Sequence, residues 1–156
     1  MAWLDGRNAK TKTGLVLSAP TETLASAIAE EWTNQGENLD QSSIPLTLLL
    51  ASTVEGGEAG SNTWREEICK YLGTDLLCYR EETDRALIQK QADNWDPLLD
   101  WFSQTFGVRL ALASGIIAVE QPPAAIDSVR SSLRAVSPEA LFGLSKAVAI
   151  FGSAVL

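Results

Sequence analysis

The sequence predicts an α+β fold: a small N-terminal antiparallel β-sheet with a covering helix, followed by a mostly α-helical domain that carries a short β-hairpin. Three observations support this prediction. Asp5-Gly6 and Thr13-Gly14 interrupt short apolar runs in residues 2–18, as turns do in hairpins. Apolar residues then recur at helical spacing through most of the chain. A length of 156 residues with 46% apolar composition suffices to bury a core, as one domain or two small ones.

The first helix is expected in the segment TETLASAIAEEWTNQG, at residues 21–36. Its first threonine suits an N-cap and its final glycine suits a helix end. Leu24, Ile28 and Trp32 are spaced four residues apart and therefore share one helix face. We expect that face to cover the N-terminal sheet, with Trp32 as the anchor between the helix and the sheet.

The next two segments divide the chain. NLDQSSIPLTLLLAS has leucines that are buried in either a helix or a strand, and its pattern leaves both open. The glycines of VEGGEAGSN, at residues 54–62, predict a loop. The domain boundary is therefore expected near residues 54–61. It separates an N-terminal α/β region at 1–56 from a helical domain at 57–156.

The helical domain is expected to open on the segment TWREEICKYL. Thr63 and Glu66 have the spacing of a capping box, and Gly73 suits the helix end. TDLLCYR follows as a short strand or an extended link. We then expect a helix at residues 83–94.

Another helix is expected to begin at Asp96, with Pro97 in its first turn and Gly107 at its end. The segment VRLALASGIIAVEQ predicts a hairpin that turns at Ser114-Gly115. Two further helices are expected, one opened by PP and one by SPE. The apolar stripe of the last helix still runs at Leu156, which indicates a truncated chain or an apolar end docked on another surface.

Composition removes several classes of function. The net charge of −8 argues against nucleic acid or an anionic membrane as partner, since both select basic surfaces. The absence of histidine removes Ser-His-Asp and Cys-His catalysis and most zinc sites. Cys69 and Cys78 lack CxxC spacing and are expected as buried, reduced thiols. We expect no cofactor, no metal and no membrane insertion. Without a signal-peptide pattern we expect the bacterial cytoplasm, or the mitochondrial matrix in a eukaryote.

The segment QADNWDPLLDWF concentrates aromatic and acidic side chains. Asp96 and Asp100 lie four apart, so a helix places both carboxylates on one face, as acid–base catalysis would need. A simpler interpretation makes Asp96 an N-cap and Asp100 a favourable charge near the helix start. Trp95 and Trp101 fit either core packing or an interface anchor.

Several segments together resemble one family. They are LDGR near the start, PTETLASAIAEEW, IPLT, YLGTDLLCYR, and WDPLLDW followed by GIIAVEQP, in collinear order over nearly the whole chain. The set resembles the assembly-chaperone family for the catalytic head of F-type ATP synthase, which has mitochondrial and bacterial members. Members of that family usually have further strands before LDGR and a charged segment after the last helix.

The resemblance implies a small α/β region, a mostly helical second domain and no catalysis. It implies that a monomer binds the alpha subunit of the F1 head and shields its subunit interface until beta takes its place. The residues carried over as partner-binding are Trp32, Tyr79, Arg80, Trp95, Asp96 and Trp101. Arg80 is expected either to pair with Asp75 or Glu81 or to contact the client.

Two other functions compete with this one. A generic protein-interaction adaptor would differ only in its client. A small hydrolase using Asp or Glu would need a pocket that holds two carboxylates in different environments.

Overall fold

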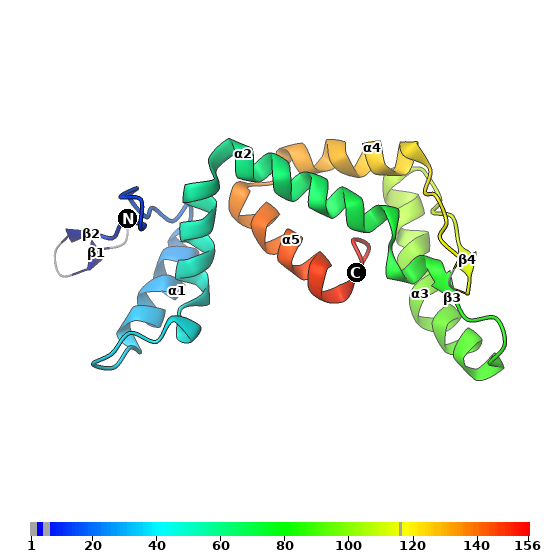
Figure 1. The fold of residues 1–156 in the computed structure, drawn as a ribbon, viewed down its shortest axis with the longest axis horizontal. Helices are drawn as coiled ribbons and strands as arrows, with labels where there is room; N and C mark the ends of the chain where they lie inside the picture. The colour runs from blue at the N-terminus through cyan, green and yellow to red at the C-terminus, as the bar shows by residue number, and fades with distance from the viewer. Residues whose placement is uncertain (1–2, 5–6, 116) are drawn as a thin grey trace. The chain divides into compact units, whose positions relative to one another are not determined.

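The computed structural model describes residues 3–4, 7–115 and 117–156 and is mostly helical (Figure 1). The chain forms two compact units, Met1–Ser61 and Asn62–Leu156. Each unit has its own cluster of buried apolar side chains. Among the described residues, no helix is both long enough and apolar enough to cross a membrane.

The first unit contains little sheet. Strand β1 (Trp3–Leu4) pairs antiparallel with β2 (Arg7–Asn8), and an isolated antiparallel bridge joins Lys10 to Val16. The predicted Asp5-Gly6 turn lies outside the described residues. The predicted turn at Thr13-Gly14 is confirmed, because Gly14 has a φ of 89° and its N–H donates to the Thr11 carbonyl.

Helix α1 (Glu22–Thr33) begins as predicted, since the Thr21 hydroxyl accepts a hydrogen bond from the Leu24 N–H. It ends at an Asn34 cap, two residues before the expected glycine. The predicted apolar face is confirmed: Ile28 is in the core of the unit, and Leu24 and Trp32 pack against that core. The buried members of this core are Ala9, Leu17, Ile28 and Leu50.

Helix α2 (Pro45–Gly73) spans three segments that were predicted separately: a leucine-rich segment, a loop and a second helix. The leucine-rich segment, whose pattern left both helix and strand open, is helical from Pro45 onward. The predicted loop at 54–62 is wrong, because this segment is helical on both sides of a kink at Gly57, and the capping box at Thr63 is wrong because the helix has begun before that residue. Gly57 alone leaves helical geometry, with φ 55° and ψ −144°. The bend is thus confined to one glycine, and helix-favouring residues such as alanine and glutamate keep the flanking turns helical. The predicted end at Gly73 is confirmed.

In the second unit, the later part of α2 packs with α3 (Arg85–Phe106), α4 (Pro123–Ser132) and α5 (Pro138–Phe151) (Figure 1). The core is built from apolar stripes of these helices. Its most buried large side chains are Phe102, Leu72, Leu77 and Leu141. The openings of the last two helices at Pro123 and Pro138 are confirmed, and the Ser137 hydroxyl caps α5 by accepting from the Ala140 N–H.

Helix α3 is continuous, so the predicted division into two helices is wrong. Its N-cap is Asp84, whose carboxylate accepts from the N–H groups of Ala86 and Leu87. Pro97 lies inside the helix on its exposed side, where water can satisfy the carbonyl that loses its partner. Gly107 ends the helix in the left-handed conformation, as predicted.

The predicted hairpin at Ser114-Gly115 is wrong. Strand β4 (Ala113–Ser114) pairs instead in parallel with β3 (Tyr79–Arg80), which lies after a 3₁₀ turn at Leu76–Cys78. The Gly115 N–H donates to the Arg80 carbonyl at 2.9 Å. The segment still folds back, but a side chain joins its two arms: the Gln121 amide donates to and accepts from the Ala111 backbone, both at 2.9 Å.

The end of α5 also differs from the prediction. The helix stops at Phe151, and Gly152 caps it in the left-handed conformation with a φ of 66°. Residues 153–155 turn back into the unit, where Val155 belongs to the core. The apolar stripe therefore does not run uncapped to Leu156.

Candidate functional site

Three of the six proposed partner-binding residues meet on one side of the second unit. The Arg80 Nη2 atom lies 2.8 Å from Asp96 Oδ1, and the Arg80 guanidinium carbon lies 5.4 Å from the centre of the Trp95 ring. Arg80 Nε also donates to the Leu77 carbonyl at 2.9 Å. One turn of 3₁₀ helix and strand β3 thus place the arginine over α3, where it makes an ion pair and a cation–π contact.

This geometry corrects two predictions. Arg80 pairs with Asp96, not with Asp75 or Glu81. Asp96 is not an N-cap, because it lies in the middle of α3. The side chain of Arg80 is 13% exposed and that of Asp96 is 53% exposed, so the pair lies at the surface with its cation mostly covered.

Tyr79 precedes Arg80 on β3, whereas Trp101 lies five residues after Asp96 on α3 and therefore on a different face of that helix. Tyr79 is half-buried and faces Ala113 in the parallel pairing. Trp101 is 52% exposed, and its ring lies edge-on to Phe106 with 6.3 Å between ring centres. Trp101 is therefore an exposed aromatic side chain on a rigid helix, which is a frequent property of interface anchors.

Trp32 lies apart from this group, in the first unit. Its indole N–H donates to the Thr47 hydroxyl at 3.0 Å. The neighbouring Glu31 carboxylate accepts from the Thr47 hydroxyl at 2.7 Å and from the backbone N–H groups of Leu46 and Thr47. The polar anchor of Trp32 is therefore the start of α2 rather than the sheet, and the pair Glu31–Trp32 ties α1 to α2.

Asp96 and Asp100 both line a shallow groove between α3 and the segment that follows it, and both are exposed. Acid–base catalysis would need one carboxylate to be desolvated relative to the other. Two carboxylates open to water lack that difference, so the arrangement does not favour the hydrolase. Among the described residues, no group of three or more Asp, Glu, Cys or His side chains could hold a metal ion.

Asp75, which was not among the predicted functional residues, is completely buried. Its Oδ1 accepts from the Leu77 N–H at 3.0 Å. Its Oδ2 accepts from the Ser153 hydroxyl at 3.0 Å and from the N–H groups of Ala154 at 2.7 Å and Val155 at 3.2 Å. This carboxylate joins the end of α2 to the residues after α5. The Asp-Leu-Leu sequence offered a local signal, since an aspartate often accepts from the N–H two residues on.

The two cysteines are buried and free, as predicted. Burial raises the pKa of the Cys78 thiol to about 11 and also raises the pKa of Cys69. Both thiols are therefore protonated at neutral pH and behave as small apolar side chains.

The second unit also exposes large apolar side chains outside this cluster. Ile117 is 76% exposed, and at the end of α5 Ile150 is 80% and Phe151 is 56% exposed. Exposed apolar side chains that cluster commonly mark surfaces for protein partners.

Comparisons with known proteins agree on one family. A family model described as ATP12 chaperone protein matches residues 2–103. The chain is 29% identical over 157 residues to the mitochondrial protein atp12 of Schizosaccharomyces pombe, covering 93% of this chain and 54% of that protein.

Two solved structures have the same fold. The crystal structure of Atp12 from Paracoccus denitrificans has a TM-score of 0.91 and 35% identity, covering 98% of this chain and 66% of that one. A protein of Agrobacterium tumefaciens, named as a candidate chaperone, also has a TM-score of 0.91, with 32% identity over 98% of this chain and 57% of that one. The chain thus spans between about half and two thirds of the length of these relatives.

Proposed function

The chain belongs to the ATP12 chaperone family, and from this premise we propose that it is an assembly chaperone for the F1 head of F-type ATP synthase. It binds the newly made alpha subunit and shields the surface that will face a neighbouring subunit. The beta subunit then takes its place. The observation that carries the proposal is the likeness to the Paracoccus denitrificans Atp12 structure over 98% of this chain, with a TM-score of 0.91.

The physical basis is competition for one surface. An orphan subunit exposes an apolar interface that would otherwise aggregate. A chaperone must cover that interface and still lose to the native partner, so the difference between the two affinities matters more than either value. A moderately apolar, strongly acidic chaperone suits this requirement, because exposed apolar side chains give attraction while the net charge of −8 keeps the free protein soluble.

We propose that the client contacts Tyr79, Arg80, Trp95 and Asp96 and, on another face of α3, Trp101. Trp101 is the best anchor, because half of its side chain is exposed on a helix that is packed against the core. Arg80 and Trp95 are held by the contacts described above, so little side-chain entropy is lost when a partner binds there. Trp32 contributes by holding the first unit together.

We extend this proposal to the oligomeric state and the cellular compartment of the protein. It acts as a monomer wherever the alpha subunit is made or imported. That place is the cytoplasm in a bacterium and the mitochondrial matrix in a eukaryote.

Co-expression with separate alpha and beta subunits tests the proposal. We expect affinity capture of this chain to retain alpha and not beta, and to increase the amount of soluble alpha. Trp101→Ala should lower the captured amount of alpha, about fivefold or more for an anchor residue. Leu48→Ala in the first unit, where Leu48 is 45% exposed, is the matched control and should capture alpha normally. Capture of beta alone, or of neither subunit, would contradict the proposal.

A further inference from the structure

A shallow groove on the second unit lies between α3 and the segment that follows it. Asp96, Leu99 and Asp100 line it from the helix. Arg109, Leu110 and Leu112 line it from the following segment, and its volume is about 250 Å³. The groove adjoins the Arg80–Asp96 ion pair, because Asp96 belongs to both.

The size of the groove points to a side chain as its occupant. Sites for small molecules usually enclose about 300–1,000 Å³ and bury most of the ligand. This groove is smaller and open, so it suits one or two side chains of a protein partner. Leu112 is 53% exposed, while Leu99 and Leu110 are half-buried and pack against the core. An aliphatic side chain placed here would cover apolar surface that is now in contact with water.

The charges around the groove favour a basic partner. Asp93, Asp96 and Asp100 follow one another at spacings of three and four, so they form one exposed stripe along α3. Of these carboxylates only Asp96 has an ion pair among the described residues, with Arg80. Arg109 on the opposite wall forms no ion pair within the described part of the chain. Asp100 on the α3 wall is therefore a carboxylate without an ion pair among the described residues, and a partner cation is attracted to this wall rather than to the wall that holds Arg109.

The same charges argue against a second copy of this chain in the groove. The net charge of −8 gives two copies a mutual repulsion at any acidic contact. A client segment that carries a lysine or arginine gains attraction at the same place.

We propose that this groove docks a segment of the alpha subunit in which a large aliphatic side chain is followed closely by lysine or arginine. The aliphatic side chain fills the space between Leu99, Leu110 and Leu112, and the cation pairs with Asp100. The assignment rests on the proposed function, since it specifies where and by what chemistry the client is held.

A charge reversal at the groove tests the ionic contact. Asp100→Lys places a cation where the client cation should bind, and we expect the dissociation constant for alpha to rise about tenfold at low salt. Glu37→Lys is the control, because it makes the same change of charge at an exposed residue of the first unit that does not line the groove. It should change the dissociation constant less than about twofold, because it alters the net charge without touching the proposed contact.

A second pair of variants tests the apolar contact. Leu112→Ala should weaken binding of alpha about threefold to tenfold through lost apolar area. Leu48→Ala on α2, where Leu48 is 45% exposed, should change it less than twofold. All four side chains are exposed, so thermal unfolding of the variants should match the wild type and exclude misfolding as the cause.

The outcomes separate this inference from the proposed function. If the wild type binds alpha and the groove variants bind as tightly as their controls, the groove assignment is wrong and the chaperone function stands. Equal weakening by Asp100→Lys and Glu37→Lys would show only general electrostatic attraction and would also overturn the assignment. If the wild type binds no alpha, the proposed function fails and this inference fails with it.

Discussion

Replacing Asp75 by asparagine removes the charge from the buried carboxylate that joins α2 to the end of the chain. The carboxylate accepts four hydrogen bonds, one on Oδ1 and three on Oδ2. Asparagine has the same shape but one acceptor oxygen. If that oxygen faces the three donors, its NH₂ group faces the Leu77 N–H, and that donor is left without a partner.

The magnitude follows from these bonds. A hydrogen bond to a charged group contributes about 1.5–3 kcal/mol, and the loss of one leaves a buried donor unpaired. The other three become neutral bonds, which are about half as strong. Removing a buried charge offsets part of this loss, because the ion no longer has to be desolvated. We therefore expect Asp75→Asn to lower the free energy of unfolding of the second unit by about 3 kcal/mol.

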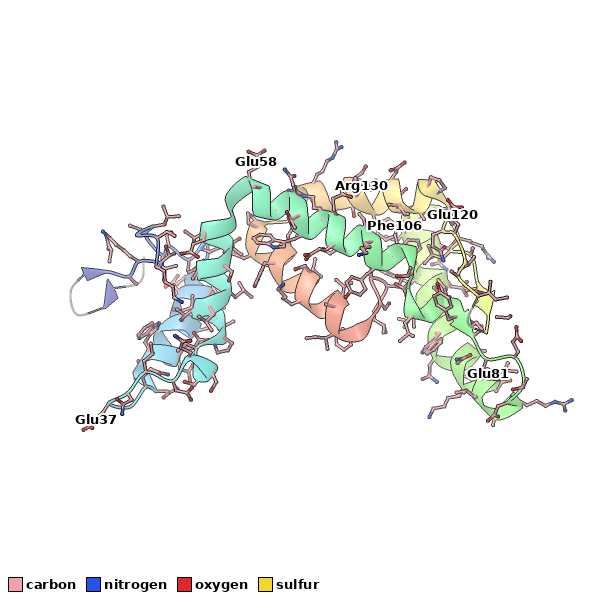
Figure 2. The ribbon with its side chains drawn as sticks, viewed as in Figure 1. Glu37, Glu58, Glu81, Phe106, Glu120 and Arg130 are labelled. Atoms are coloured by element: carbon pink, nitrogen blue, oxygen red, sulfur yellow. The ribbon has the colours of Figure 1, made fainter. Side chains whose placement is uncertain are left out.

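Urea unfolding at neutral pH measures this effect, and hydrogen exchange at the Ala154 and Val155 amides localises it. Asp127→Asn is the matched control, because it makes the same chemical change in a side chain that is 73% exposed and paired with Arg130 on α4 (Figure 2). That variant should lose less than about 1 kcal/mol. A loss below about 1 kcal/mol for Asp75→Asn as well would refute the argument that the buried carboxylate holds the unit together.

Three further predictions follow from other contacts. Trp32→Phe removes the hydrogen bond to Thr47 and should lower the stability of the first unit by about 1–2 kcal/mol, measured by hydrogen exchange at the Ile28 and Leu50 amides. Glu81, in the turn before α3 (Figure 2), has its pKa lowered from 4.5 to about 2 by hydrogen bonds from the side chain and backbone of Thr83. Because the folded-state pKa is lowered, its contribution to the turn is complete above about pH 4.5 and is lost as the pH falls toward 2; an NMR titration that puts the Glu81 midpoint near 4.5 would contradict this. Cys78, whose pKa is raised to about 11, should react with iodoacetamide slowly in the native protein and quickly in denaturant, and fast native labelling would show that it is not buried.

Local signals predicted the ends of helices better than the pairing of strands. Thr21, Gly107 and Ser137 were identified as caps because their effect depends only on neighbouring residues. The hairpin at Ser114-Gly115 was wrong because β4 finds its partner in β3, more than thirty residues earlier. Local alternation does not contain that information.

Glycine and proline are poor guides to helix ends in this chain. The glycines at 56, 57 and 60 predicted a loop, but only Gly57 leaves helical geometry, and Pro97, which predicted a helix start, lies inside α3. Tertiary packing of the flanking turns outweighs a local cost of about 1–3 kcal/mol.

Only part of the candidate site could be predicted, because its contacts join segments that are separate in the sequence. Trp95 and Asp96 are neighbours in the sequence, and family resemblance added Arg80, but the contact between them depends on how β3 crosses α3. The buried role of Asp75 could be predicted only for its contact with Leu77, because its other three hydrogen-bond donors lie almost eighty residues away.

The distance along the chain between Asp75 and Val155 affects how the protein can fold during synthesis. A ribosome adds about 5–20 residues per second, so roughly 4–16 seconds separate the synthesis of this aspartate from that of its last hydrogen-bond partner. Until then the carboxylate must stay in water, because burying it unpaired is too costly. The core of the first unit has all its residues between Ala9 and Leu50 and can form early. The core of the second unit cannot be completed before residues 153–155 are synthesised. Nascent chains that stop before residue 153 should therefore lack a second core that is protected from hydrogen exchange.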